Sequence, residues 1–244
     1  MSPYHRSLVN PPIAFAHRGA RRDAPENTLR AFQLALELGA TGLESDVWLT
    51  ADAAPVLDHD GFVGPRLRRR TIADLALADL PSHIVTLERL YGECGSSFEL
   101  SLDIKDPDAA GPVVSVAGRF GEASDRLWLC HPDWRLVAQW RALSDDVHLV
   151  DSTRLRRIKE GPERRAAALA DAGVDAVNLH HTDWTGGLTT LFHRFGRYCL
   201  GWDCQHERVL DAILASGIDA VYSDHVEAMM AAVARRSIRG DGST

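Results

Sequence analysis

The feature that most constrains the fold is a regular alternation along the whole chain. Short apolar segments of strand length alternate with longer segments that repeat apolar residues at helical spacing. Several of the helical segments end at a glycine, as at Gly39, Gly173 and Gly217, which is a common helix stop. Eight segments have strand character: 13–16, 42–48, 98–104, 127–130, 147–150, 176–179, 198–202 and 220–222. The clearest helical segments are 26–38, 134–143, 163–172 and 207–216.

Strands that alternate with helices pair in parallel through crossover connections. Eight such units in a chain of 244 residues fit a (β/α)8 barrel, whose usual size is about 250 residues. The main alternative is a doubly wound open sheet, but no G-x-G-x-x-G turn follows the first strand. The sequence therefore predicts an α/β protein of the (β/α)8, or TIM-barrel, class.

The repeat suggests a simple domain organisation. We expect an N-terminal extension over 1–12, a single barrel domain over 13–234, and a flexible polar tail over 235–244. Within the barrel, 60–83 is longer than an ordinary strand-to-helix loop and is rich in arginine and turn residues. We interpret it as a loop excursion after the second strand, of the kind that carries function.

Composition excludes several classes of protein. The net charge is −7, from 27 basic and 34 acidic side chains, which argues against a nucleic-acid partner. The four cysteines are too scattered for a disulfide framework or a zinc site. No signal peptide and no apolar run of about 18–20 residues is visible, so we expect a cytoplasmic protein without stable membrane insertion. The oligomeric state is left open.

Charged side chains gather at the predicted carboxyl ends of the strands, where a barrel of this class carries its active site. Glu44 and Asp46 are two residues apart on one strand, so their side chains share a face. Asp103 and Lys105 have the same relation on the next strand. Three carboxylates that converge in this way predict an oxygen site for one hard divalent cation, Mg2+ or Ca2+.

Two histidines lie beside these groups. His17 ends the first strand and is followed by Arg18, and His59 follows the second strand. Histidines next to carboxylates and an arginine indicate acid/base chemistry. Four other residues at strand ends have roles that the sequence leaves undecided: His131, His180, His181 and Asp203.

The motifs resemble those of the glycerophosphodiester phosphodiesterase family. The resemblance starts at His17-Arg18-Gly19, continues through Pro25-Glu26-Asn27-Thr28 and Glu44-Ser45-Asp46, and includes His59-Asp60. It extends to Leu102-Asp103-Ile104-Lys105 and to Ser223-Asp224 near the end of the chain. Members of that family are (β/α)8 barrels with an excursion after the second strand. They use a divalent cation to hydrolyse glycerophosphodiesters to glycerol 3-phosphate and an alcohol.

The resemblance also implies roles for individual residues. It makes His17 and His59 the general acid/base pair and places Glu44, Asp46 and Asp103 as metal ligands. Arg18 and Lys105 would contact the phosphate, and Trp202 would form a wall of the substrate site. Only Lys105 and Lys159 of the 27 basic residues are lysines, so a lysine kept at position 105 is informative.

The chain departs from the family pattern at a few positions. The third-strand carboxylate, usually Glu, is Asp103 here, and Asp203 adds a charge after Trp202. Asp203 either favours a cationic leaving group or caps the next helix. Two other functions stay open beside the hydrolysis of soluble glycerophosphodiesters. One is a lysophospholipase D-type activity on lysolipids, and the other is a non-catalytic barrel that binds a phosphate ligand.

Overall fold

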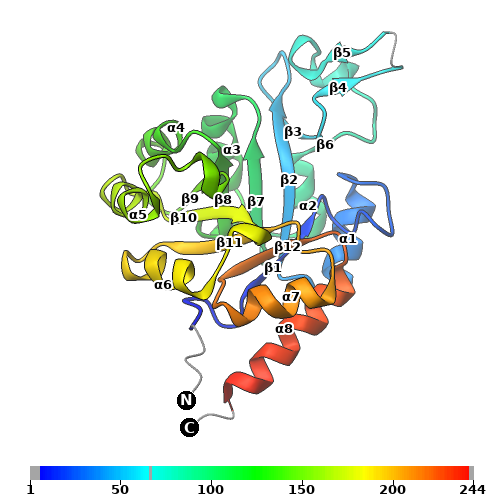
Figure 1. The fold of residues 1–244 in the computed structure, drawn as a ribbon. Helices are drawn as coiled ribbons and strands as arrows, with labels where there is room; N and C mark the ends of the chain where they lie inside the picture. Colours follow the sequence, from blue (N-terminus) through cyan, green and yellow to red (C-terminus); the bar gives the residue numbers. More distant parts are fainter. Residues whose placement is uncertain (1–5, 66–67, 242–244) are drawn as a thin grey trace.

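The computed structural model describes residues 6–65 and 68–241. Eight parallel strands form a ring in which each strand pairs with its two neighbours, and the pairing of β1 with β2 closes it. The helices cover the outside of this ring (Figure 1). The fold class predicted from the alternating pattern is therefore confirmed. The ring strands are β1 (Ile13–His17), β2 (Gly42–Leu49), β7 (Glu99–Ile104), β8 (Leu127–His131), β9 (His148–Ser152), β10 (Ala176–His180), β11 (Tyr198–Trp202) and β12 (Ala220–Ser223).

Each helix begins and ends where local chemistry favours it. Thr28 caps the first helix by accepting a hydrogen bond from the Ala31 N–H, and Asp133 caps a later helix in the same way. Gly39, Gly173 and Gly217 all adopt positive φ after their helices, as their spacing predicted. The helices are α1 (Leu29–Glu37), α2 (Leu87–Cys94), α3 (Ala110–Ala117), α4 (Trp134–Gln139), α5 (Pro162–Asp171), α6 (Gly186–Arg194), α7 (Glu207–Ala215) and α8 (Val226–Asp241).

Alternate residues of each strand serve two different cores. Leu43, Val47 and Leu102 belong to the large core between the strands and the helices. Phe15 belongs to a smaller core inside the ring, where its ring stacks on Tyr222 at 4.7 Å between centroids. A fully buried side chain of this size stabilises the fold by about 1.5–3 kcal/mol. This division leaves the inward positions near the carboxyl ends of β2 and β7 free for polar side chains.

Close packing at the start of β2 requires a glycine. A Cβ atom at Gly42 would lie 2.5 Å from the ring of Phe15, which is far inside van der Waals contact. The missing side chain lets the aromatic ring fill the bottom of the barrel beneath the polar groups of β2. The barrel is therefore packed below its mouth.

The predicted excursion after the second strand is also present. It leaves the barrel beyond the end of β2 and lies apart from the ring in Figure 1. The antiparallel strand β3 (Pro55–Leu57) first pairs with β2, and β6 (Val85–Thr86) pairs with β3. Between them, β4 (Phe62–Val63) and β5 (Arg70–Thr71) form a separate two-stranded sheet. These four short strands were not anticipated, because segments of two or three residues carry no measurable periodicity.

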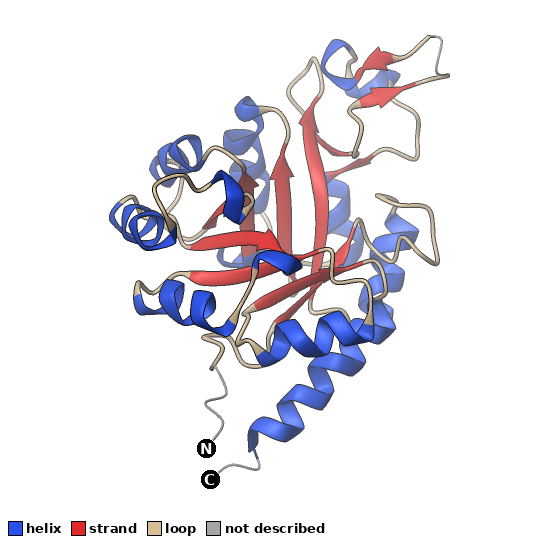
Figure 2. Ribbon diagram, viewed as in Figure 1, coloured by secondary structure: helices blue, strands red, loops and turns tan. Residues whose placement is uncertain are grey.

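The two chain ends differ from the expectation in part. At the N-terminus, residues 7–9 are tied to the barrel, since Ser7 and the backbone N–H of Leu8 donate to Asp219. At the C-terminus, α8 continues to Asp241, so residues 235–241 of the expected flexible tail are helical, and their flexibility stays a prediction (Figure 2). The polar sequence of this segment is compatible with a helix as well as with a loop. Residues 1–5 and 242–244 lie outside the described part.

Candidate active site at the barrel mouth

The three predicted metal ligands converge at the mouth. Glu44, Asp46 and Asp103 each offer a carboxylate oxygen, and these oxygens lie within 4.8 Å of one another. Asp46 and Asp103 are direct partners in the register of β2 and β7, which explains the closeness. Glu44 and Asp46 are almost fully buried, at 6% and 3% exposure. The i, i+2 spacing places Glu44 and Asp46 on one inward face, and the register of β2 and β7 places Asp103 beside Asp46.

Burying several carboxylates together is electrostatically costly, and the titration of Glu44 reflects this cost. Burial is the largest cause, and it raises the pKa of Glu44 to about 8. The charge of His17 opposes this shift, whereas Asp46 and Asp103 add to it. The pKa of Asp103 is also raised, chiefly by burial. The three carboxylates therefore need nearby positive charge if all of them are to stay ionised.

Lys105 supplies part of that charge. Its Nζ lies 2.8 Å from Asp46 Oδ1 and 3.2 Å from Asp103 Oδ2. Burial would lower the pKa of Lys105, but Asp103 and Asp46 outweigh it and raise the pKa, so the side chain stays charged. Lys105 follows β7 directly, and its backbone N–H donates to the carbonyl of Val47 on β2. This hydrogen bond holds Lys105 beside the carboxyl end of β2. Lys105 thus contacts the predicted metal ligands directly.

His17 is oriented by a carboxylate from the last strand. Its Nδ1 lies 2.6 Å from Oδ1 of Asp224, and its Nε2 lies 3.8 Å from Oε2 of Glu44. Burial would lower the pKa of His17, but Glu44 and the hydrogen bond to Asp224 outweigh it and raise the pKa. With Nδ1 engaged, Nε2 is the atom left to exchange a proton with a bound molecule. Sequence reasoning noted Asp224 in the closing motif but gave it no role.

Arg18 is held in place by several groups of the same motif. Its backbone N–H donates to Glu44 Oε2 at 3.0 Å, and its guanidinium pairs with Glu26 at 3.1 Å. Arg18 adopts a positive φ of 55°, which the tight turn after β1 requires. The Asn27 side chain accepts a hydrogen bond from Ser45 and fastens the following loop to β2. Pro25-Glu26-Asn27-Thr28 therefore supports the position of Arg18.

His59 stands apart from the other predicted residues. Its side chain is 42% exposed, and its Nδ1 contacts Asp60 at 2.8 Å. The neighbouring Asp58 donates its backbone N–H to the carbonyl of Asp46, so His59 follows the chain immediately beyond the carboxylates. His59 does not line the cavity described next. Its catalytic role stays a prediction.

A cavity of about 520 Å³ opens at the mouth beside His17, Arg18, Glu44 and Asp103. Trp202 forms part of its wall, and its contact with a substrate stays a prediction. Tyr222, which donates or accepts a hydrogen bond with Ser101 at 3.0 Å, forms part of the lining as well. Sequence reasoning missed most of the opposite side, which comes from β9 and β10 themselves and from the segments after β9 and β11: Ser152, Thr153, Arg154, Arg156, Arg157, Asn178 and Gln205. In a barrel of this class the active site lies at the carboxyl ends of the strands. The residues that follow β9 could have been predicted on that basis, but no site residue was predicted for that strand.

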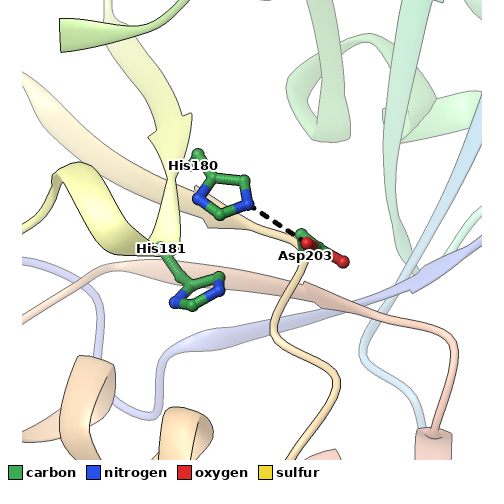
Figure 3. A group of neighbouring side chains, drawn as sticks. All are labelled: His180, His181 and Asp203. Carbon is green, nitrogen blue, oxygen red and sulfur yellow. Dashed lines mark hydrogen bonds and ion pairs between the residues drawn. The ribbon is translucent and has the colours of Figure 1, made fainter.

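The undecided residues at the strand ends form two separate arrangements. His180, His181 and Asp203 lie together at the ends of β10 and β11, and His180 Nε2 is 3.1 Å from Asp203 Oδ2 (Figure 3). His180 also contacts the edge of Trp202, with ring centroids 4.5 Å apart. His131 instead accepts a hydrogen bond from the Asp133 N–H and packs against Trp140. Asp203 does not cap α7, since His206 occupies that position.

Fold and site together define a class of protein: a (β/α)8 barrel with a carboxylate cluster and an oriented histidine at its mouth. Comparison with known proteins points to one family within that class. Residues 17–101 match the glycerophosphoryl diester phosphodiesterase family. This match confirms the resemblance that the motifs indicated.

Individual relatives agree with the family match. Glycerophosphodiester phosphodiesterase 1 of Rattus norvegicus is 56% identical over 50 residues, which cover 20% of this chain and 15% of the rat protein. YhdW of Bacillus subtilis (strain 168), whose name assigns it provisionally to the same enzyme family, is 26% identical over 233 residues. That match covers 86% of this chain and 93% of YhdW.

A solved structure supports the fold over nearly the whole chain. It is the Oleispira antarctica phosphodiesterase in complex with the product sn-glycerol-3-phosphate, with a TM-score of 0.79. Its sequence is 20% identical, and the match covers 91% of this chain and 97% of that one. The likeness therefore concerns the fold.

Proposed function

We propose that this chain hydrolyses glycerophosphodiesters to glycerol 3-phosphate and an alcohol, with the help of one divalent cation. The observation that carries the proposal is the convergence of Glu44, Asp46 and Asp103 at a cavity of about 520 Å³ that His17, Glu44 and Asp103 line. The match of residues 17–101 to the family supports it. The product bound to the Oleispira antarctica relative supports the same reaction class.

The carboxylates suit a divalent cation on the evidence of their own contacts. Asp46 Oδ2 is buried and forms no hydrogen bond with the described residues, although Arg18 Nε lies 3.5 Å from it in an ion-pair contact. A buried carboxylate oxygen without a hydrogen bond, in a cluster of three carboxylates, is suited to bind a cation. Oxygen ligands of this kind select Mg2+ or Ca2+ over softer metals. Glu44, Asp46 and Asp103 would hold the cation, which would neutralise charge on the phosphate oxygens when bound.

The protein's own residues supply the remaining chemistry. Arg18 and Lys105 bring positive charge to the phosphate and stabilise the charge that develops on its oxygens. His17, oriented by Asp224, exchanges a proton at Nε2. We assign the second proton transfer to His59, which lies on the side of the mouth next to the excursion. Attack by the glycerol hydroxyl through a cyclic phosphate and direct attack by water are both compatible with this arrangement.

The cavity lining favours small, water-soluble substrates. Charged and polar side chains dominate it, and Trp202 and Tyr222 are its aromatic members. A lysolipid substrate needs an apolar surface for its acyl chain. No helix within residues 6–65 and 68–241 is long and apolar enough to cross a membrane. The predictions of a cytoplasmic location and of no nucleic-acid partner stay predictions.

The experiment is to measure glycerol 3-phosphate released from glycerophosphocholine and glycerophosphoethanolamine by the purified protein. Reactions contain Mg2+, Ca2+ or excess chelator, and the Asp46→Asn variant serves as the matched control for the cation site. We expect cation-dependent release that the variant loses. Absence of release with every cation, followed by release of choline from lysophosphatidylcholine, would replace the proposal with the lysolipid activity. Absence of both would leave a binding protein.

A further inference from the structure

The side of the cavity that faces His17 is formed by an arginine wall, which we define as Arg154, Arg156 and Arg157. All three line the cavity and follow β9. In the ring of strands, β9 is four strands from β1 in either direction, so it lies directly opposite. A substrate whose phosphate binds at Arg18, on the side of the carboxylate cluster, would therefore extend toward the arginine wall.

The charge of the wall is only partly neutralised. Arg154 is paired with Asp183, with Nε and Oδ2 2.6 Å apart, and its guanidinium lies 5.6 Å from the centre of the Trp202 ring. Asp183 also accepts the backbone N–H of Leu155, which fixes the start of the segment. Arg156 and Arg157 are exposed, and neither forms an ion pair with a carboxylate in the described part of the chain. Two cationic side chains are therefore available to a ligand.

A single carboxylate near the wall lines the same part of the cavity, and it is already engaged. Asp203 is the only acidic lining residue outside the cluster at β2 and β7 within residues 6–65 and 68–241. Its Oδ2 accepts a hydrogen bond from His180 Nε2, and Figure 3 shows the imidazole aimed at it. One engaged carboxylate does not offset two unpaired guanidinium groups. The wall is thus poorly suited to a choline or ethanolamine cation.

We propose that the preferred substrates are glycerophosphodiesters whose alcohol part carries a negative charge, such as a second phosphate group. Guanidinium groups bind phosphate oxygens by paired, charge-assisted hydrogen bonds. The glycerol part has no charge to pair with the wall, so the alcohol part is the one that reaches it. This inference rests on the proposed function and deepens it by naming the substrate class.

The test compares substrates that differ in one charged group. Glycerophosphoinositol and glycerophosphoinositol 4-phosphate share the same scissile bond, and the second adds one phosphate to the alcohol. Glycerophosphocholine provides a cationic alcohol. We expect kcat/KM for the phosphorylated compound to exceed that for the other two by about tenfold at low salt. This preference should decline as ionic strength rises from about 0.05 M to about 0.5 M, because exposed charges are screened.

Variants then locate the preference. Arg156→Ala combined with Arg157→Ala should bring the ratio between the two inositol compounds close to one. Arg164→Ala, on the outer helix α5 and exposed, removes the same kind of charge outside the cavity lining and should keep the wild-type ratio. Thermal unfolding of each variant checks that the fold is retained.

The outcomes separate this inference from the proposed function. If none of the three compounds is hydrolysed with any cation, the proposed function fails. If all three are hydrolysed with similar kcat/KM, the reaction stands and the arginine wall does not select charge. A double variant that lowers kcat/KM for all three compounds by the same factor also overturns the inference, because it shows a general effect on the barrel.

Discussion

His17 and Asp224 form a hydrogen-bonded pair with Nδ1 and Oδ1 2.6 Å apart, although 207 positions separate them in the chain. The closure of the barrel brings them together, because β1 pairs with β12 as well as with β2. Asp224 also forms an ion pair with Arg21, whose Nε lies 3.9 Å from the same oxygen. The pair links the ends of the first and last strands of the barrel at its mouth.

Replacement of Asp224 by Asn should lower the pKa of His17. The hydrogen bond and the charge of Asp224 both raise that pKa, so their loss lets the effect of burial prevail. We expect kcat to fall by about tenfold to a hundredfold, part of the about 10²–10⁴ that a positioned acid/base group contributes. NMR titration of the His17 ring in the metal-free protein measures the shift. An unchanged His17 pKa in a folded variant would refute the orienting role.

Replacement of His59 by Ala should lower turnover by about 10²–10⁴-fold. The side chain is 42% exposed and contacts Asp60, so the melting temperature should stay within about one degree of wild type. Asp60→Asn is the matched control, since it removes the contact and keeps the imidazole. Activity of the His59 variant within a few-fold of wild type would mean that another group makes the second proton transfer.

Replacement of Lys105 tests its place between the carboxylates. Lys105→Met removes the ammonium from Asp46 and Asp103, and we expect the metal-free protein to lose about 2–4 kcal/mol of unfolding free energy. Added Mg2+ or Ca2+ should restore part of this loss, because cation binding to the folded state alone stabilises it. Urea unfolding with and without cation measures both effects. Lys105→Arg, which keeps the charge in a larger fork, should still impair activity.

The buried ion pair between Arg165 and Asp151 offers a test of stability away from the mouth. Nη1 of Arg165 lies 2.5 Å from Oδ2 of Asp151, and neither side chain is more than 8% exposed. Arg165→Met leaves the carboxylate buried and unpaired, so we expect a loss of about 3–5 kcal/mol. Urea denaturation measures it, and Arg164→Met on the exposed neighbouring position is the control.

The same variant should be more sensitive to alkaline pH than wild type. Burial raises the pKa of Asp151 to about 6 even though Arg165 opposes the shift, compared with 3.8 for a free side chain. A folded-state pKa above the unfolded value means that stability is lost as pH rises from about 4 through the folded pKa. Without Arg165 that pKa rises further. The stability difference from wild type should therefore be greater at pH 8 than at pH 5, and the opposite order would contradict the account.

Much of the barrel could be predicted from the sequence because its strands are strongly patterned. β8 and β10 each extend one residue beyond the predicted segment, and β11 matches it at both ends. The paired spacing of Glu44 with Asp46 and of Asp103 with Lys105 fixed the inward face of two neighbouring strands. Parallel pairing in register then brought the carboxylates together. These features depend on local periodicity, which a single sequence displays.

Other features depend on contacts between distant segments. The partnership of His17 with Asp224 requires the barrel to close, and the pairing of Arg154 with Asp183 joins two loops that no local pattern connects. Asp203 was open to two interpretations because only the fold brings His180 to it. The continuation of α8 to Asp241 was missed because the polar end of an amphipathic helix has the composition of a loop.

The attachment of residues 7–9 to Asp219 has a practical consequence. Asp219 lies just before β12, at the amino-terminal end of the strands, and α8 runs from the mouth back toward that same end (Figure 1). Both ends of the described chain thus leave the barrel on the face opposite the cavity. A polypeptide fused at either end, or a surface to which one end is tethered, would leave the mouth facing open solution.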